Sequence, residues 1–240
     1  MKILCLECSA TPASVAIIDN GKIIGSSYTN VKLTHSQTLM PMIKSLLDAT
    51  LLNADSIDGI AISNGPGSFT GIRIGISTAK GFGFSKDLPC VGVSTLRAMA
   101  ENFKGSNCIV CAVMDARCNQ VYNAIFDIDG DDTQRLCDDR AILCNELAEE
   151  ITKLISEKNK RIIICGDGAE LFYKFVSETN DIQLAPQMYR FQNAAAVGLA
   201  SLEDFENNNT ITTDCLLPVY LRLPQAEREL KSKNIQEEKL

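Results

Sequence analysis

Short apolar runs separated by turn residues open the chain. Residues 2–8, 14–19 and 22–29 each place apolar side chains at the spacing and length of one strand. Asn20-Gly21, between the second and third runs, is the dipeptide most typical of a tight β-hairpin. The pattern therefore predicts three consecutive antiparallel strands.

Helices and strands alternate in the residues that follow. The predicted elements are a helix at 36–52, a strand at 59–63, a helix at 69–85, a strand at 89–93 and a helix at 95–103. Three antiparallel strands followed by this alternation predict a mixed α/β sheet with helices on both faces.

The order of elements then begins again. Residues 108–114 form an apolar run that ends at an acid, Asp115, and residues 121–127 form another that leads into a turn at Asp129-Gly130. The opening of the chain shows the same succession of strand, acid, strand and turn. We therefore interpret the sequence as an internal duplication.

Further helices and strands complete the second half. They are a helix at 145–156, a strand at 161–165, a Gly166-Asp167-Gly168 turn into a helix, and an alanine-rich helix at 193–205. A boundary near Gly105 divides the chain into an N-terminal lobe at 1–105, a C-terminal lobe at 106–223 and a tail at 224–240. The tail is dense in Lys, Glu and Gln, so we expect it to be solvated or frayed.

The most specific stretch is a glycine-rich turn that leads into a helix. Gly65-Pro66-Gly67 fits a tight turn, and Ser68 or Thr70 can cap the helix that follows. The glycine spacing differs from the dinucleotide-binding fingerprint, and the lysine of a P-loop does not follow. As a nucleotide-binding motif the turn is weak.

Small residues recur at every fourth position of the helix at 69–85. They are Gly71, Gly75, Ala79 and Gly83, and the bulk of Ile72, Ile74, Ile76 and Phe82 lies elsewhere around the helix. Each glycine costs up to about 1 kcal/mol relative to alanine, so the close approach of another backbone should compensate. That backbone belongs either to the chain's own sheet or to the helix of a partner.

Apolar residues also cover more than one face of the helix at 36–52. Leu39, Ile43, Leu46 and Leu47 form a stripe at helical spacing, and Met40, Met42 and Leu51 widen it. The flexible methionines suit an interface, so the surplus face is expected to meet another helix. Burial on two sides within the lobe is the alternative.

The composition narrows the function. The chain has 240 residues, 45% of them hydrophobic, which predicts a globular protein. Its formal net charge of −7 argues against binding of nucleic acid by the chain alone. The sequence contains no apolar run long enough to cross a bilayer, and the cytoplasm is the default compartment.

Cysteine and histidine provide little for chemistry. Ten cysteines without a secretory signal indicate a reducing compartment and free thiols. Cys5/Cys8 and Cys108/Cys111 have CxxC spacing but lie in strand-like runs, where residues three apart point to opposite faces, so we expect buried cysteines rather than a metal site. His35, the one histidine, is expected to bond to a loop or cap a helix.

Two carboxylates could face a cleft between the lobes. Glu7, close to Ser9, and Asp115 each stand at the end of a strand in their half of the chain. Paired acids there could hold magnesium beside a phosphate, or they could be turn residues, and the latter is favoured because no Lys or Arg is clearly aimed at the same point.

Several segments together resemble the TsaB (YeaZ) family. They are Glu7-Cys-Ser-Ala-Thr11, His35-Ser36 with Pro41, the run Gly65-Pro66-Gly67-Ser68-Phe69-Thr70-Gly71-Ile72-Arg73-Ile74-Gly75, Gly92-Val-Ser-Thr-Leu96, Met114-Asp-Ala-Arg117 with Val121-Tyr122, and Pro218-Val-Tyr-Leu-Arg222. The likeness spans nearly the whole chain. Glu7 replaces the usual Asp, and Cys118 and Gln120 replace the usual Arg and Glu, which weakens any claim to nucleotide binding.

The resemblance implies a fold and a role. The fold would be the two-lobed actin-like, sugar-kinase and Hsp70-type ATPase fold, a duplicated ribonuclease-H-like α/β unit. The role would be that of a non-catalytic subunit that binds a TsaD-type enzyme as a heterodimer. With a TsaE-type ATPase, this complex forms threonylcarbamoyladenosine beside the anticodon of tRNA.

The family's helical interface maps onto residues 36–52 and 69–85. The partner-binding residues would then be Leu39, Met40, Ile43, Leu46, Leu47, Gly71, Ile72, Gly75, Ala79 and Phe82. No cofactor is firmly implied, and ATP with Mg would be held only in the complex; tRNA would also be reached through the complex. An ATPase or a glycoprotease-like peptidase of the same fold is the alternative, and a homodimer through the same helices is possible without the partner.

Overall fold

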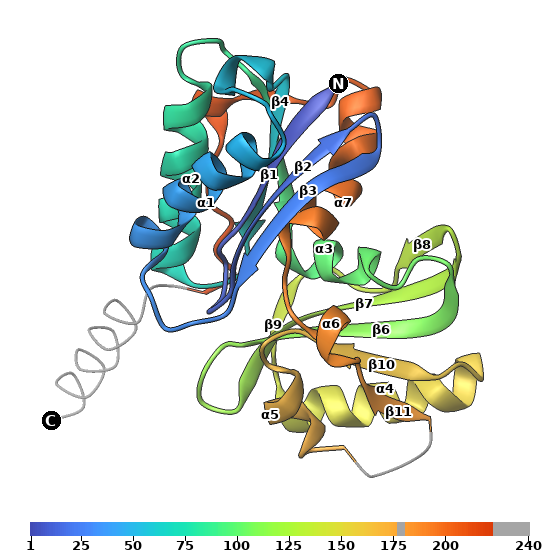
Figure 1. The fold of residues 1–240 in the computed structure, drawn as a ribbon. Coiled ribbons are helices and arrows are strands. Elements are labelled where there is room, and N and C mark those ends of the chain that lie inside the picture. The colour runs from blue at the N-terminus through green and yellow to red at the C-terminus, as the bar shows by residue number, and fades with distance from the viewer. Residues whose placement is uncertain (177–180, 223–240) are drawn as a thin grey trace, which may run out of the picture.

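The computed structural model describes residues 1–176 and 181–222, and their strands form two six-stranded sheets. Figure 1 shows the sheets in separate lobes, one above the other. The predicted charged tail at 224–240 lies outside the described residues.

The first sheet begins with the predicted antiparallel strands. Its strands, in spatial order, are β12 (Ile211–Thr212), β5 (Pro89–Ser94), β4 (Gly59–Gly65), β1 (Lys2–Glu7), β2 (Ala13–Asp19) and β3 (Lys22–Thr29). β1 pairs antiparallel with β2 and parallel with β4, which confirms the predicted mixed sheet.

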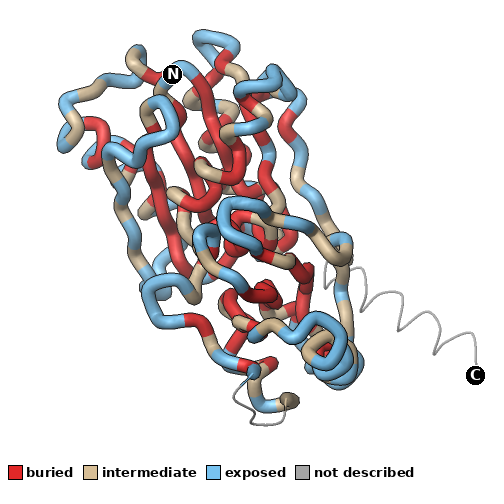
Figure 2. The backbone as a smooth tube through the Cα atoms, turned by 90° about the vertical axis from the view of Figure 1, so that its right-hand side faces the viewer, coloured by how far each residue is buried: buried red, intermediate tan, exposed pale blue. Residues whose placement is uncertain are grey.

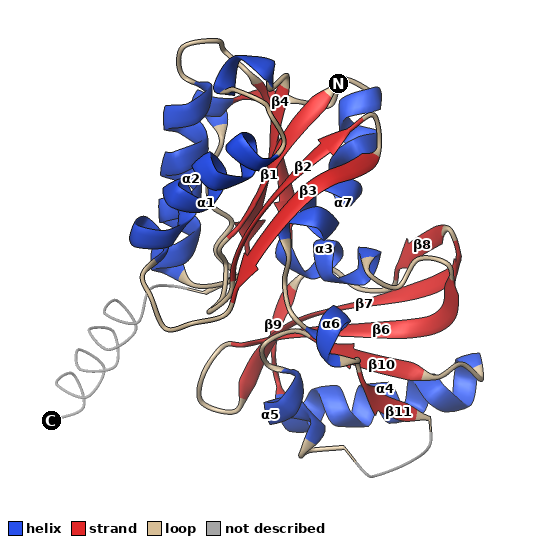
Figure 3. Ribbon diagram, viewed as in Figure 1, coloured by secondary structure: helices blue, strands red, loops and turns tan. Residues whose placement is uncertain are grey.

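Helices cover both faces of the first sheet (Figure 3). They are α1 (His35–Ala49) and α2 (Phe69–Gly83) on one face, and α3 (Thr95–Glu101) and α7 (Ala194–Glu206) on the other, with short 3-10 turns at Ala54–Ser56 and Thr213–Cys215. Alternate β1 side chains point to the two faces: Leu4 and Leu6 join the apolar cluster under α1 and α2, and Ile3 and Cys5 join the cluster under α7. The central strands are therefore buried on both sides, as Figure 2 shows.

The second sheet repeats this topology. Its strands run β11 (Ile182–Leu184), β10 (Ile162–Cys165), β6 (Ser106–Asp115), β7 (Gln120–Gly130) and β8 (Asp132–Arg135), and β9 (Arg140–Leu143) also pairs with β7. Its helices are α4 (Cys144–Lys158), α5 (Ala169–Tyr173) and α6 (Gln187–Arg190). β6, β7 and β10 here correspond to β1, β2 and β4 of the first sheet, so the predicted duplication of the fold is confirmed.

The predicted extent of the C-terminal lobe, 106–223, is wrong at its end. The sheet changes at residue 106, where β6 begins, but α7 packs on β1 and β2, and β12 pairs with β5 of the first sheet. The chain therefore returns to the first lobe. The reason is that the second apolar face of the first sheet needs a cover, and the small side chains of α7 let Gly198 approach Cys5 and Ile18 closely.

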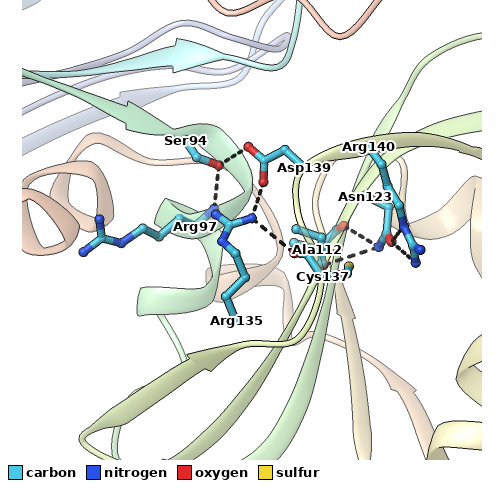
Figure 4. A network of polar contacts seen from close by, with 9 residues as sticks. Ser94, Arg97, Ala112, Asn123, Arg135, Cys137, Asp139 and Arg140 are labelled. Atoms are coloured by element: carbon cyan, nitrogen blue, oxygen red, sulfur yellow. Dashed lines mark hydrogen bonds and ion pairs between the residues drawn. The ribbon is translucent and has the colours of Figure 1, made fainter.

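The lobes are also joined by side chains. Ser94, at the end of β5, caps α3 by accepting a hydrogen bond from the Arg97 N–H and donates its hydroxyl proton to Asp139, in the loop between β8 and β9. Arg135 donates a hydrogen bond to the other oxygen of Asp139, and Figure 4 shows this chain of contacts. A carboxylate of the second lobe is thereby bound at the start of a first-lobe helix.

Sequence reasoning missed the shortest elements: β8, β9, β11, β12 and α6. Each has four residues or fewer, and β8 is wholly polar, so hydrophobic periodicity carries no signal for it. In the described part of the chain, every helix is too short or too polar to cross a membrane.

Candidate functional site

The glycine-rich turn joins β4 to α2 and lies against the turn that follows β1. Gly65 and Gly67 have positive φ angles of 136° and 157°. Ser68 caps α2, accepting a hydrogen bond from the Gly71 N–H at 3.2 Å, and its own N–H donates to the Ser9 carbonyl at 2.7 Å. Of the two predicted capping residues, Ser68 is therefore the cap; Thr70 lies inside the first turn of the helix.

A cleft of about 400 Å³ lies between the lobes. It is lined by Ser9, Ala10, Thr11, Gly67, Ser68 and Phe69 from the first lobe, and by Met114, Asp115, Ala116, Arg117, Tyr122 and Asp167 from the second. The cleft thus gathers the turns that follow β1, β4, β6 and β10. Parallel strands bring these turns together because their carboxyl ends meet at one edge of each sheet.

The two predicted acids behave differently. Asp115 lines the cleft as expected and accepts hydrogen bonds from the backbone N–H of Arg117 at 2.7 Å and from its guanidinium at 3.2 Å. Glu7 is 0% exposed, and one of its oxygens accepts a hydrogen bond from the Ser9 N–H at 2.6 Å. Glu7 is absent from the lining of the cleft, so the prediction that it faces the cleft is wrong; the residue is fully buried, and this burial raises its pKa.

Sequence reasoning did not single out the second cleft acid, Asp167. Burial raises the pKa of Asp167 to about 6, against the opposing effect of a hydrogen bond from Gln192, and the negative charge of Asp115 adds to the rise. Its position between two glycines after a buried strand was the available signal.

The cleft residues themselves supply little positive charge for the phosphates of a nucleotide. Phosphate sites use cationic side chains or free N–H groups at a helix start. Here Arg117 is paired with Asp115, Asp167 adds a further carboxyl, and the N–H groups of Ser68 and Gly71 are used within the protein. The lining residues of this cleft therefore provide no cationic side chain free of a carboxylate.

The other candidates from the sequence are structural. His35 Nε2 lies 2.8 Å from the Ala10 carbonyl oxygen, which confirms that it bonds to a loop. Cys5 packs toward Gly198 on α7, and Cys8 toward Gly75 on α2, so these two thiols lie on opposite faces of the sheet as predicted. All ten cysteines are free, and burial raises the pKa of the Cys5 and Cys8 thiols.

The small-residue face of α2 meets the chain's own sheet. A Cβ added at Gly71 would overlap the Cys8 carbonyl oxygen, and one at Gly75 would overlap the Cys8 thiol and lie 3.1 Å from Ile62 Cδ1. Gly71, Ile72, Gly75, Ala79 and Gly83 are all buried. Of the two possibilities for this groove, its own sheet is therefore correct, and Gly71, Ile72, Gly75 and Ala79 are wrongly predicted as partner-binding residues.

The apolar stripe of α1 is buried in the same core. Leu39, Ile43, Leu46 and Leu47 all join the cluster with Leu4 and Leu6. Leu39 and Leu46 are buried because α1 packs on β2 and β3. Their prediction as partner contacts is therefore wrong. Ile43 and Leu47 are buried but also form part of the floor of a groove.

That groove lies between α1 and α2 and has a volume of about 1040 Å³. Its apolar lining comprises Met40, Ile43, Leu47, Leu52, Ala54, Ile74, Gly81 and Phe82. Its polar lining comprises Ser36, Lys44, Asp48, Asn53, Arg73, Ser77 and Thr78. Met40, 52% exposed, and the half-buried Phe82 are the predicted contact residues that remain accessible.

The groove residues on α2 lie on the face of the helix that points away from its buried glycines. Ile74, Thr78 and Gly81 were not chosen, although they recur at helical spacing on that face. The regular glycine stripe was the more conspicuous signal, and it marked the inner face of the helix.

The fold defines the class of the protein. Two ribonuclease-H-like sheets in tandem, with the cleft between them, form the two-lobed fold of actin-like proteins, sugar kinases and Hsp70-type ATPases. A solved structure described as YeaZ from Pseudomonas aeruginosa has this fold with a TM-score of 0.78 and 23% identity, and covers 92% of this chain and 99% of its own.

Comparison with known sequences defines the family. The model of the family described as "TsaD: tRNA N6-adenosine threonylcarbamoyltransferase" matches residues 25–230. The Escherichia coli protein named "tRNA threonylcarbamoyladenosine biosynthesis protein TsaB" is 32% identical over 65% of this chain and 68% of its own length. The Bacillus subtilis protein of the same name is 28% identical over 68% of this chain and 69% of its own. The chain belongs to the TsaB (YeaZ) family.

Proposed function

We propose that this chain is a non-catalytic subunit that docks on a TsaD-type enzyme and supports the formation of N6-threonylcarbamoyladenosine beside the anticodon of tRNA. Its curated relatives are named as biosynthesis proteins for this nucleoside. The observation that carries the docking step is the open groove between α1 and α2.

The groove has the chemistry of a helix-binding surface. Its floor is apolar, formed by Ile43, Leu47 and Phe82. A Cβ added at Gly81, on its edge, would have no described heavy atom within 4 Å other than those of its chain neighbours and the adjacent backbone of α2. An apolar surface of this kind gains free energy when a partner covers it, and helices commonly bind in such grooves. Lys44, Asp48 and Arg73 supply charges at the rim that can select a partner.

Charge explains why tRNA would be reached through the complex. The chain carries a formal net charge of −7, so its interaction with the phosphate backbone is unfavourable unless another subunit supplies a basic surface. The proposal therefore includes a TsaD-type subunit, a TsaE-type ATPase, and tRNA bound by the complex. A subunit that works on tRNA shares its compartment, so a cytoplasmic location is also part of the proposal.

The proposal assigns catalysis to the partner. Within this chain Arg117, the cationic side chain of the cleft lining, is paired with Asp115, and the His35 ring is hydrogen-bonded to the Ala10 carbonyl. The alternative, an ATPase or peptidase, predicts hydrolysis by the isolated chain. Turnover of ATP with magnesium, or of a peptide library, by the purified chain would refute the non-catalytic assignment.

Gly81→Leu is the sharpest test of the groove. Gly81 is exposed and has room for a side chain, so leucine there fills the groove without disturbing the core. We expect affinity for the TsaD-type partner, measured by calorimetry, to fall at least tenfold, and formation of the modified nucleoside to fall with it. Ser45→Leu, an exposed position on α1 outside the groove lining, is the control and should leave the affinity unchanged.

The result also separates the possible occupants. If the isolated chain is a dimer in sedimentation and Gly81→Leu makes it monomeric, the same groove serves a second copy. Equal partner affinity for Gly81→Leu and the unsubstituted chain would refute the groove as the docking site.

A further inference from the structure

The C-terminal end of the described chain crosses from one lobe to the other. Residues 216–222, which we call the strap, follow the 3-10 turn Thr213–Cys215 of the first lobe. The Val219 N–H donates a hydrogen bond to the Asn64 carbonyl at 2.8 Å, and the Asn64 amide donates to the Leu217 carbonyl at 3.3 Å. The first part of the strap is therefore fixed to the end of β4.

Tyr220 of the strap stands between the groove and the cleft. Its ring stacks on Phe69, which lines the cleft, with ring centroids 4.4 Å apart. Its hydroxyl accepts a hydrogen bond at 2.7 Å from Nε of Arg73, which lines the groove. The Arg73 guanidinium also lies 5.5 Å from the centre of the Tyr220 ring, within range of a cation–π interaction.

The next two residues reach the second lobe. Leu221 packs against an apolar cluster that contains Met114 and Tyr122, and the Arg222 guanidinium donates a hydrogen bond to the Ala116 carbonyl. Ala116 is itself part of the cleft wall. Consecutive residues of the strap thus contact a groove residue, the first wall of the cleft and the second wall.

We propose that the strap couples the groove between α1 and α2 to the separation of the two lobes across the cleft. Arg73 has five N–H donors and gives one of them, on Nε, to Tyr220, so a carboxylate of a docked partner can bind the same guanidinium through its outer nitrogens. Such a contact holds Arg73, and through it Tyr220, in one position. Arg222 then holds the second lobe at the corresponding distance.

The coupling rests on the proposed docking partner, and it is reciprocal. If docking restrains the strap, then loosening the strap weakens docking by the same free energy, even at a residue outside the groove lining. Tyr220→Phe is the appropriate change, since it removes the hydroxyl that Arg73 binds and keeps the ring that stacks on Phe69.

The chain contains thiols that can carry labels for measuring the distance between the two lobes. Cys118, after β6 in the second lobe, and Cys215, in the first lobe, are exposed, Cys137 is half-buried, and the other seven cysteines are buried. Spin labels on Cys118 and Cys215 in a Cys137→Ala background report the distance between the lobes by pulsed electron paramagnetic resonance. Tyr28→Phe, at an exposed tyrosine on β3, is the matched control.

Without a partner, we expect a single narrow distance for the parent chain and for Tyr28→Phe, and a broader distribution for Tyr220→Phe. With the TsaD-type partner, the parent distribution should shift or narrow, whereas Tyr220→Phe should respond less and bind about three- to tenfold more weakly. Identical distributions for parent and Tyr220→Phe, with and without partner, would overturn the coupling. A parent chain that does not bind the partner would refute the proposed function and the coupling with it, whereas binding with unchanged distances would refute the coupling alone.

Discussion

Adding the same methyl group at two glycines of α2 should change the free energy of unfolding in opposite directions. Gly75 faces the sheet, where a Cβ would overlap the Cys8 thiol and lie 3.1 Å from Ile62 Cδ1. Gly81 faces the groove, and apart from its chain neighbours and the adjacent backbone of α2, no heavy atom of residues 1–176 and 181–222 lies within 4 Å of a Cβ added there. Gly75→Ala and Gly81→Ala therefore separate packing from helix propensity.

The magnitudes follow from the two environments. Replacing glycine by alanine inside a helix stabilises it by up to about 1 kcal/mol, and this gain applies to both positions. At Gly75 the methyl group also overpacks a closed core, which costs about 1–3 kcal/mol, because the Cys8 thiol is buried and bonded to the Gly71 carbonyl at 3.2 Å. We expect Gly81→Ala to be more stable than the parent by about 0.5–1 kcal/mol and Gly75→Ala to be less stable by about 1–2 kcal/mol.

Urea and thermal unfolding followed by circular dichroism measure both variants, and their midpoint temperatures should differ by about 5–10 °C. Cys8→Ala provides a second check, since removing the thiol opens space for the new methyl group. In a double-mutant cycle the two changes, Cys8→Ala and Gly75→Ala, should cost less together than the sum of their separate effects. Equal stability of Gly75→Ala and Gly81→Ala would refute the close packing of α2 on the sheet.

Three further predictions concern the cleft and the thiols. Cys118 has a φ of 55° between two other left-handed residues, so Cys118→Gly should raise the free energy of unfolding by about 0.5–1 kcal/mol, as measured by urea unfolding; an unchanged or lower value would contradict this. Asp167, with its pKa raised to about 6, keeps its proton in the folded state where the unfolded chain has lost it, so stability should fall as pH rises from about 4 to 6. Asp167→Asn should remove this fall in stability, as measured by urea unfolding of both proteins between about pH 4 and 6. The same pH dependence of stability in both proteins would contradict the prediction. In native protein, a thiol reagent should modify Cys118 and Cys215 rapidly and Cys137 slowly, and the buried thiols only after unfolding; early reaction of Cys5 or Cys8 would contradict the described packing.

The sequence predicted the architecture because the spacing of apolar residues within each segment reflects which of its side chains are buried. Each main strand and helix was found, with boundaries differing by a few residues, since strands buried on both faces and helices with an apolar stripe leave clear signals. The duplication was visible for the same reason. The short strands β8 and β9 were missed because they are brief and are held by pairing with β7.

The candidate site was predicted less well, because location in space is not local. Glu7 and Asp115 have the same place in their halves, yet Glu7 is fully buried and only Asp115 lines the cleft. Periodicity showed that α1 and α2 had apolar surface to cover, but it could not tell which side faced the sheet. The family resemblance, rather than the periodicity, assigned Leu39 and Gly75 to a partner, and both are buried against strands of this chain.

The sequence alone determined the main elements, their order, the duplication and the family resemblance, because all of these depend on the spacing and identity of neighbouring residues. The tertiary structure alone decided that α7 returns to the first lobe, that the glycine stripe of α2 is internal, and that a groove remains open between α1 and α2. These outcomes depend on contacts between residues far apart in the chain. Their free energy depends on which surfaces meet, and that is settled only when the whole chain has folded.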